Sequence, residues 1–553
     1  MKLYRLFLAA LVVIAVAALT AEQALANGDI KKVKHIIIVM QENHSFDNYF
    51  GVLPYAVGTP YASGPCDPDN HACVDGLSCD RDPATGAYHC SNFNRDEDGT
   101  QVFAFHSTDY CVKTDLNHEW VGTHMEINYA DPNAGLLLSP NDGFVLVNDA
   151  SNQPDQGGEN PTDDETMSFY NEEDIGFYYD LAKTFAISDR YFSSILGPTF
   201  PNRSYLMAAT SFGHLTSDEA LPSVERPLVF YQPITGTIFD LLDQHGISWT
   251  NYFNDGPQAT SFHSFLTEAF THPERFQQHF RLFKKPAPLA YPPEVQALLN
   301  SAPSFLEDVK AGTLPSVALV DPSFGALPAV PENDEHPGSD MRAGQHFVAQ
   351  VVNAVRKSPK TWPDSIIFIT YDEHGGFYDH VAPPAAPQGD APTPDGIAPG
   401  QCADASNPPV SEAPGGGLNC TESQMIETQF CPGFTATGPF PAACATFNQL
   451  GVRVPLMAVS PFAKPHYVSH RVSDHTSLLA LIERRFLRPD PDAAGDASQT
   501  PHLTARDAHA DTLEDLFDFD HSPSRHAHVM PLHDVPAASP SDPGCSPSAG
   551  EVF

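Results

Sequence analysis

Four short apolar runs place the strongest constraint on how this chain can fold. Aliphatic runs of this length are typical of strands buried on both faces of a parallel sheet. Helical patterns lie between them; in one, Phe347, Val351 and Val355 share a face at helical spacing. Strands that alternate with helices predict an α/β fold with a mainly parallel central sheet flanked by helices. The four expected parallel strands cover residues 34–40, 316–320, 365–370 and 454–459, and further helices are expected within 235–245 and 474–486.

The first residues predict export from the cytoplasm. Lys2 and Arg5 precede an apolar run, and Ala24 and Ala26 offer a small-residue cleavage site, so residues 1–26 are interpreted as a secretory signal peptide. The apolar run of about 14 residues is shorter than the about 20 that a membrane span needs, and we expect no transmembrane segment. In the secreted or periplasmic environment thus expected, the ten cysteines are interpreted as disulfide staples rather than as thiolate metal ligands.

We expect a single catalytic domain over residues 27–520. Two stretches within it, at about 54–115 and 384–450, are rich in Cys, Gly, Pro and polar residues. They are interpreted as loop insertions, because such a composition contributes little to a core. Residues 521–553 are expected to form a flexible C-terminal tail.

The net charge excludes some partners. The chain has 29 Lys and Arg residues against 69 Asp and Glu residues, a formal charge of −40. So acidic a chain is not expected to bind nucleic acid or an anionic membrane surface by electrostatic attraction. The charge is compatible with a phospholipid or a small phosphate ester as substrate, and with transient contact with a membrane surface.

Pairs of hard oxygen ligands follow two of the expected strands. Glu42 and Asn43 come soon after the first strand, and Asp372 and Glu373 come soon after the third. All four should therefore lie at the carboxyl ends of the strands, where ligands bind in an open α/β sheet. Adjacent carboxylates repel one another unless a cation neutralises them, and oxygen ligands suit Mg²⁺, Mn²⁺ or Ca²⁺ better than soft metals. We expect His374 to orient these carboxylates; alternatively, the residues after Glu42 only cap a helix.

A hydroxyl and a guanidinium occur together in GPTFPNR, residues 197–203. The Gly-Pro pair predicts a rigid turn, Thr199 supplies the hydroxyl, and Arg203 follows four residues later. Coordination to a metal would activate the Thr199 hydroxyl for attack on phosphorus. On its own, the segment is equally compatible with an ordinary proline turn.

These segments belong to a set of blocks that resembles the bacterial phosphoesterase family. That family contains secreted phospholipases C and related acid phosphatases, with the plant non-specific phospholipases C as relatives. The blocks follow the family's order and run from about residue 34 to about residue 520. The long blocks are ENHSFDNYFG (42–51), GPTFPNR (197–203), YDEHGGFYDHVAPP (371–384) and DHTSLLALIERRF (474–486), and weaker matches are DLNHEW (115–120), EHPGSD (335–340) and ARDAHADTLEDLFDF (505–519).

The resemblance implies an alkaline-phosphatase-like α/β fold, here with Cys-rich loop insertions, and a bound divalent metal. Superfamily relatives often carry two metals, but the histidines of a second site are not evident in this sequence, so we expect one ion. Mg²⁺, Ca²⁺ or Mn²⁺ is favoured, and Zn²⁺ is an alternative. The resemblance also implies that a threonine hydroxyl is the nucleophile, so that a phosphothreonine forms and is then hydrolysed. The implied metal ligands are Glu42, Asn43, Thr199, Asp372 and Glu373.

Histidines and two polar residues in the matched blocks are expected to contact the substrate. His118, His336 and His475 are the expected catalytic histidines, and one of them protonates the leaving alkoxide. The sequence leaves open which of the three does so. Asn202 and Arg203 are expected to bind substrate.

The sequence leaves three functions open. The first is a phospholipase C, favoured because Thr at position 199 resembles the phospholipases whereas the acid phosphatases carry Ser. The second is a broad acid phosphatase acting on monoesters; the third, a catalytically dead binding protein, is disfavoured because every proposed ligand is intact. A sulfatase is disfavoured because its motif needs Cys or Ser. A choline head group would need an aromatic cage, for which Trp120, Tyr170, Tyr178, Tyr179 and Phe377 are candidates if they are not core residues.

Overall fold

The computed structural model describes most of the expected catalytic domain. The expected signal peptide over residues 1–26 and most of the expected insertion 384–450 lie outside the described residues. The described residues are 29–112, 115–132, 139–148, 163–211, 217, 235–261, 265–327, 330–389, 395, 447–488 and 500–527.

A sheet of eight strands forms the centre of the fold, in the order β12-β11-β13-β1-β14-β15-β10-β16. All of its neighbouring strands are parallel except at β15, which runs antiparallel to both β14 and β10. The fold is therefore mixed α/β with a mainly parallel sheet, as the sequence predicts. The strands are β12 (Phe280–Leu282), β11 (Trp249–Phe253), β13 (Val317–Val320), β1 (His35–Gln41), β14 (Ser365–Tyr371), β15 (Leu456–Val459), β10 (Ala186–Ser188) and β16 (Tyr467–Ser469).

The direction of β15 corrects one expectation. The apolar run 454–459 does form a buried strand, but not a parallel one. A strand buried on both faces has the same apolar character whichever way it runs, because direction is set by the connections rather than by the residues. The other three apolar runs form the parallel strands β1, β13 and β14.

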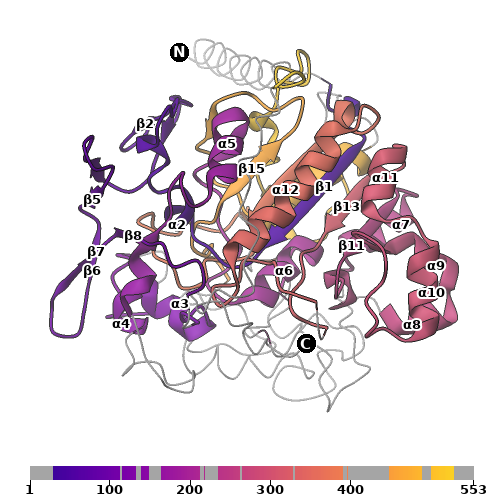
Figure 1. Ribbon diagram of the computed structural model, residues 1–553, viewed down its shortest axis with the longest axis horizontal. Helices are drawn as coiled ribbons and strands as arrows, with labels where there is room; N and C mark the ends of the chain where they lie inside the picture. The colour runs from indigo at the N-terminus through magenta and orange to yellow at the C-terminus, as the bar shows by residue number, and fades with distance from the viewer. Residues whose placement is uncertain are drawn as a thin grey trace, which may run out of the picture.

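The helices cover the sheet and form one end of the molecule. Figure 1 shows α12 and α5 side by side in front of the strands, and these two helices contact each other, β14 and β15. Helices α8 to α11 gather around β11 and β12 at one end (Figure 1). The expected helices are present as α7, α12 and α14. The helices are α2 (Phe46–Phe50), α3 (Trp120–Ile127), α4 (Phe144–Asn148), α5 (Gly176–Thr184), α6 (Thr199–Ala208), α7 (Ile238–Gln244), α8 (Phe265–Thr271), α9 (Pro273–His279), α10 (Pro293–Ser301), α11 (Phe305–Ala311), α12 (Met341–Lys357), α14 (His475–Ile482) and α15 (Ala505–His509).

The expected insertion 54–115 contains short strands separated by turns and irregular segments and is stapled by disulfides, at the end of the molecule opposite α8 to α11 (Figure 1). Cys66 is bonded to Cys73 and Cys79 to Cys90, and every cysteine among the described residues is in a disulfide. The expected staples are therefore present. The short strands here and nearby are β2 (Ala62–Ser63), β3 (Cys73–Val74), β4 (Cys79–Arg81), β5 (Tyr88–Cys90), β6 (Phe93–Arg95), β7 (Gln101–Phe103), β8 (Phe105–His106) and β9 (Ser168–Phe169).

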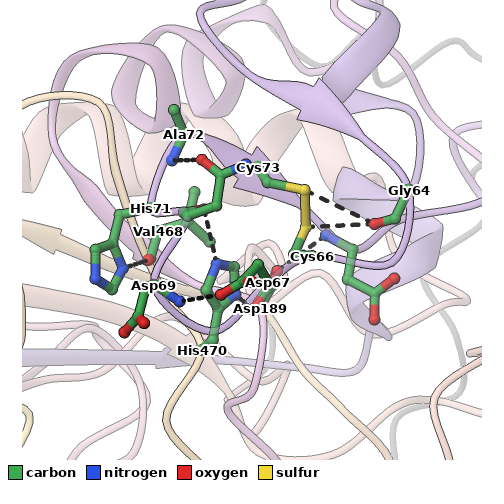
Figure 2. Close-up of a disulfide and its surroundings, with 12 residues drawn as sticks. Gly64, Cys66, Asp67, Asp69, His71, Ala72, Cys73, Asp189, Val468 and His470 are labelled. Atoms are coloured by element: carbon green, nitrogen blue, oxygen red, sulfur yellow. Dashed lines mark hydrogen bonds and ion pairs between the residues drawn. A yellow bond between two sulfur atoms is a disulfide. The ribbon is translucent and has the colours of Figure 1, made fainter.

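The loop closed by Cys66 and Cys73 covers the outer edge of β16. Figure 2 shows His71 of this loop beside Val468 of β16. The Val468 amide donates to the His71 oxygen at 3.0 Å, and His71 Nδ1 lies 2.8 Å from the Val468 oxygen. The loop thus satisfies backbone groups that an edge strand would otherwise expose to pairing with another chain.

The start of the expected C-terminal tail packs against the domain. The Ser524 amide donates to the Pro461 oxygen, and the Arg356 side chain donates to the Ala527 oxygen at 2.9 Å. The folded part of the chain therefore extends at least to Ala527. Within the described ranges, no helix is both long enough and apolar enough to cross a bilayer.

Candidate active site

The two central strands bring the paired oxygen ligands to one edge of the sheet. β1 and β14 are paired along their whole length, up to Gln41 opposite Tyr371. Glu42 and Asp372 come next in the two chains, and the Asp372 amide donates to the Gln41 oxygen at 3.2 Å. Both side chains are buried, with 5% and 0% exposure.

Asn43 and Glu373 are drawn to the same place by a close backbone approach. Gly375 has a φ of +64°, and a Cβ added to it would lie 2.2 Å from the Asn43 oxygen. Only glycine fits this conformation and this contact. The structure therefore brings together four of the five expected metal ligands, two from each motif.

Arg203 joins α6, the helix that begins at Thr199, to these strand ends. Its Nε donates to Asp372 Oδ2 at 2.7 Å, and a terminal nitrogen donates to Glu42 Oε1 at 2.9 Å. The guanidinium is fully buried and also contacts the side chain of Gln258. Its polar atoms are thus engaged by protein groups, and substrate binding by Arg203 stays a prediction.

Thr199 is the first residue of α6, one helical turn before Arg203. The Gly-Pro pair lies in the turn that leads into this helix, with Pro198 as the N-cap. Pro201 is in the first turn of the helix, which tolerates proline because the first amides need no helical acceptor. Residues four apart lie on the same face of a helix. Thr199 and Arg203 therefore share a face of α6, and Arg203 reaches Glu42 and Asp372; the expected contact of Thr199 with these carboxylates stays a prediction.

Asn202 holds the turn that leads into α6. Its Oδ1 accepts hydrogen bonds from the amides of Ser194 and Ile195, and its Nδ2 donates to the Gly197 oxygen at 2.7 Å. The side chain is fully buried. These bonds place Thr199, and the expected contact of Asn202 with substrate stays a prediction.

Two buried side chains in the cluster have polar atoms without a hydrogen-bond partner among the described residues. They are both amide atoms of Asn43 and Oε1 of Glu373. The other oxygen of Glu373 accepts from the Gly375 amide at 2.7 Å. A buried polar atom left unsatisfied is costly, and oxygens of this kind fit a hard divalent cation.

Two of the three expected catalytic histidines lie together beside this cluster. The His118 and His336 rings are 5.9 Å apart, and Oδ1 of Asp115 lies within 3.7 Å of a nitrogen of each. His118 Nε2 is 3.9 Å from the unsatisfied oxygen of Glu373. His118 therefore borders Glu373 directly, and His336 joins it through Asp115.

His475 is placed differently. It is fully buried, with Nε2 2.7 Å from the backbone oxygen of Asp372 and Nδ1 3.0 Å from the Tyr191 hydroxyl. Burial lowers the pKa of His475 to about 4. In this structure His475 supports the backbone of a metal-ligand candidate, and its expected catalytic contact stays a prediction.

His374 links the cluster to a carboxylate that sequence reasoning missed. Its Nε2 lies 2.7 Å from Glu126 Oε2, and its Nδ1 lies 3.2 Å from Glu373 Oε2. Burial disfavours the imidazolium, but these two carboxylates raise the pKa of His374 to about 9. The geometry fits the orienting role expected of His374. Glu126 follows the DLNHEW block on α3, and its helical position carried no signal of this partnership.

The aromatic residues considered for a choline cage are core residues. Each is at most 2% exposed: Trp120, Tyr170, Tyr178, Tyr179 and Phe377.

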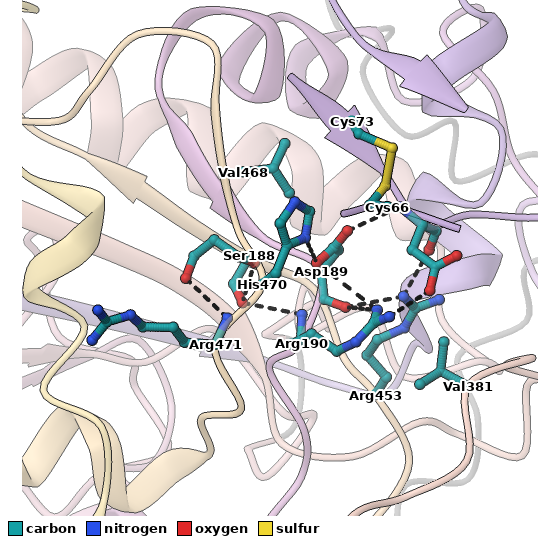
Figure 3. A network of polar contacts seen from close by, with 12 residues as sticks. Cys66, Cys73, Ser188, Asp189, Arg190, Val381, Arg453, Val468, His470 and Arg471 are labelled. Atoms are coloured by element: carbon teal, nitrogen blue, oxygen red, sulfur yellow. Dashed lines mark hydrogen bonds and ion pairs between the residues drawn. A yellow bond between two sulfur atoms is a disulfide. The ribbon is translucent and has the colours of Figure 1, made fainter. Parts of the chain in front are cut away.

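A further group of potential metal ligands, away from this site, is explained without a metal. Figure 3 shows His470 beside Asp189, near the disulfide of Cys66. His470 Nδ1 is 2.7 Å from Asp189 Oδ1, and Nε2 is 3.1 Å from the Asn70 oxygen. Both ring nitrogens therefore face acceptors, and the sulfur is already bonded.

The described residues thus place paired acids and two histidines at the carboxyl ends of a mainly parallel sheet, an arrangement typical of enzymes of the α/β class. The model of the Phosphoesterase family matches residues 33–487, and the chain belongs to this family. It is thus a hydrolase that acts on phosphoester bonds.

Its relatives include plant and bacterial enzymes. Non-specific phospholipase C6 of Arabidopsis thaliana is 28% identical over 88% of this chain and 72% of its own length. Phospholipase C B of Mycobacterium tuberculosis is 28% identical over 94% of this chain and 84% of its own length. Non-hemolytic phospholipase C of Burkholderia pseudomallei is 29% identical over 83% of this chain and 56% of its own length.

Proposed function

We propose that the protein is a metal-dependent phospholipase C that acts through a phosphothreonine, in a secreted or periplasmic location. Three relatives that carry the name phospholipase C support the substrate class. The disulfides of the described residues support an oxidising compartment. The threonine at position 199 supports the covalent route.

The bridge made by Arg203 is the observation that carries the mechanism. One guanidinium bonds Glu42 and Asp372, while Thr199 lies one turn earlier on the same helix. Three motifs that are far apart in the sequence thus meet at one point. Phosphoryl transfer depends mainly on such positioning and on electrostatic stabilisation.

The donor set fits a divalent cation. Arg203 balances only one of the two carboxylates that it bonds, and His374 is shared between Glu373 and Glu126. The cluster therefore keeps an excess of negative charge, and Asn43 and Glu373 have unsatisfied oxygens. Glu42, Asn43, Thr199, Asp372 and Glu373 would hold one ion, with Mg²⁺, Ca²⁺ or Mn²⁺ favoured and Zn²⁺ as an alternative. When bound, the ion withdraws charge from the oxygens of the hydroxyl and the phosphate.

The first chemical step breaks the ester bond to the lipid. Thr199 Oγ1 attacks phosphorus in line with the glycerol oxygen, its proton leaves to solvent, and a phosphothreonine forms as the bond to glycerol breaks. His118 or His336 donates a proton to the departing oxygen. In the second step water attacks the phosphothreonine and gives its proton to the same histidine. The bond between phosphorus and Thr199 Oγ1 breaks, Thr199 Oγ1 takes a proton back from solvent, and the phosphorylated head group is released.

The choice of substrate tests the first part of the proposal. Purified protein is assayed on p-nitrophenylphosphorylcholine and on p-nitrophenyl phosphate, before and after chelation. We expect hydrolysis of the phosphorylcholine ester, lost on chelation and restored by one of the four cations. Hydrolysis of the monoester alone would instead identify an acid phosphatase. Activity that survives complete chelation would refute the proposed dependence on a metal ion.

Variants of Thr199 test the nucleophile. We expect Thr199→Ala to lose at least about a thousandfold in kcat, and Thr199→Ser to retain measurable turnover because it keeps the hydroxyl. Thr361→Ala is the matched control, since the Thr361 hydroxyl is buried ahead of β14, at the opposite end of that strand from Asp372, and donates to the Val309 oxygen at 2.8 Å. Phosphate trapped on Thr199 after an acid quench, detected by peptide mass spectrometry, would identify the intermediate directly. Near-wild-type turnover of Thr199→Ala would refute the covalent route.

A further inference from the structure

A buried carboxylate without a part in the proposed chemistry lies directly beneath the site. Glu335 is fully buried, and its Oε2 accepts from the hydroxyls of Tyr49 at 2.7 Å and Tyr371 at 2.6 Å. Its Oε1 accepts from the hydroxyl of Tyr178 and, at 3.4 Å, from the side-chain amide Nε2 of Gln41. Each oxygen of a carboxylate can accept two hydrogen bonds, so all four acceptor positions are used.

Three of the four donors come from elements that build the site. Gln41 ends β1 just before Glu42, and Tyr371 ends β14 just before Asp372. Tyr49 lies on α2, within the ENHSFDNYFG block. Glu335 therefore connects both ligand-bearing strands through one side chain.

The backbone of Glu335 has a conformation that side chains rarely adopt. Its φ is +74°, in the left-handed region. Such a conformation persists only where the surroundings enforce it, and it clusters at functional sites. The enforcing contacts are the bond from the Glu42 amide to the Asp334 oxygen at 2.7 Å and that between His44 Nε2 and the Glu335 oxygen at 2.9 Å.

Close packing leaves the Glu335 side chain no room to move. A Cβ added to Gly344 of α12 would lie 2.1 Å from Glu335 Cγ. The helix thus approaches the carboxylate at the one position where it has no side chain. The residue that follows in the chain is His336, whose Nε2 lies 3.6 Å from Asp115 beside His118.

We infer that Glu335 is a positioning residue of the phosphoester site: the tyrosine hydroxyls hold its carboxylate and thereby fix the left-handed turn that presents His336 to the substrate phosphate. This inference rests on the proposed function only in giving His336 a contact with phosphate. Tyr178 lies on α5, outside the matched blocks, and under this inference it affects turnover indirectly, through Glu335 and His336.

A double-mutant cycle tests whether Glu335 acts through His336. Glu335→Gln keeps the shape of the side chain but replaces one acceptor by a donor, and Tyr178→Phe removes a single hydroxyl. We expect each variant to lower kcat on the hydrolysed p-nitrophenyl ester by about tenfold, because small displacements of a catalytic group have effects of this size or larger. In the His336→Ala background the same changes should alter kcat by less than about twofold, since coupled residues are not additive.

Tyr252→Phe is the matched control. Its hydroxyl is also buried and donates to a carboxylate, Asp308, at 2.8 Å, but on β11 and away from the site. It should keep wild-type kcat. If Glu335→Gln and Tyr178→Phe lower kcat by the same factor whether residue 336 is His or Ala, their role is purely structural and the inference is overturned. Wild-type kcat in both Glu335→Gln and Tyr178→Phe would overturn it too. So would wild-type kcat in His336→Ala.

A readout without turnover separates this inference from the proposed function. In histidine-labelled, chelated protein, the His336 ring resonance is assigned by its absence in His336→Ala. It should shift in Glu335→Gln and Tyr178→Phe and stay in place in Tyr252→Phe. An unmoved resonance in the first two variants would overturn the positioning role, whatever ester the protein hydrolyses.

Discussion

Removal of the Arg203 guanidinium is the most informative perturbation of the candidate site. Arg203→Met keeps a long apolar stem but leaves Glu42 and Asp372 buried without their shared cation. The wild-type bonds are charge-assisted, at 2.9 and 2.7 Å, and the guanidinium is fully buried. Breaking a buried ion pair from one side costs about 3 to 5 kcal/mol, because the remaining charge is left uncompensated. We expect a loss of stability in this range for the chelated protein.

The loss should depend on pH in a defined direction. Burial raises the pKa of Asp372 above its ordinary value, and Arg203 opposes that rise. Without Arg203 the folded state holds the Asp372 proton more tightly, whereas the unfolded chain releases it above about pH 4. The free energy of unfolding of Arg203→Met therefore falls as pH rises above about 4 and the unfolded chain loses the Asp372 proton, so the variant should be more destabilised at about pH 8 than at about pH 5.

The assay is thermal unfolding at both pH values, with and without added Mn²⁺. Under the proposed metal site, the cation should recover part of the loss in Arg203→Met, since it neutralises the same carboxylates. Arg275→Met is the control, because Arg275 forms an ion pair to Asp243 while its side chain is 48% exposed, and such pairs contribute about 1 kcal/mol or less. An unfolding temperature of Arg203→Met equal to that of wild type in chelator at about pH 8 would refute this account of the cluster.

Two further changes test other parts of the structure. Gly375→Ala should push Asn43 away from the cluster and raise the concentration of Mn²⁺ needed for half-maximal activity by at least about tenfold. The control is Gly58→Ala, at a φ of +69° with nothing within 4 Å of the added Cβ, which should leave that Mn²⁺ concentration unchanged. Equal metal dependence in both variants would contradict the close approach of Gly375 to Asn43. Joint replacement of Cys66 and Cys73 by Ser should lower the free energy of unfolding by about 2 to 3 kcal/mol through the freed loop, and unchanged thermal unfolding would show that the docked loop, not the disulfide, stabilises the edge of β16.

The sheet was predictable because its strands are buried on both faces. Residues 34–40 and 365–370 correspond almost residue for residue to β1 and β14. Strands β10 and β16 lie at the end of the sheet beyond β15. Because each has only three residues, neither leaves an apolar run long enough to recognise. The antiparallel direction of β15 could not be predicted, because the burial that defines the strand is the same in either direction.

The site was predictable as a set of residues and less so as a set of contacts. The rule that ligands gather at the carboxyl ends of strands is enough to bring Glu42 and Asp372 together. It does not say which way a side chain turns. Glu335 opens the EHPGSD block, but its tyrosine partners, like the pairing of Glu126 with His374, could not be recognised from sequence, since other segments of the fold supply these partners.

The contacts of Arg203 change which residues are available to the phosphate. A guanidinium has five N–H donors, and those of Arg203 serve Asp372, Glu42 and neighbouring protein groups. Losing these bonds to reach a substrate would leave buried carboxylates unpaired, which is costly. The anionic oxygens must then be met by other cations or donors. His118 and His336, together at the border of the cluster with His336 partly exposed, are the groups placed to do so. Under the proposed function, Arg203 would contribute by holding the helix that carries Thr199 against the acidic strand ends, and His118 and His336 by meeting the substrate phosphate.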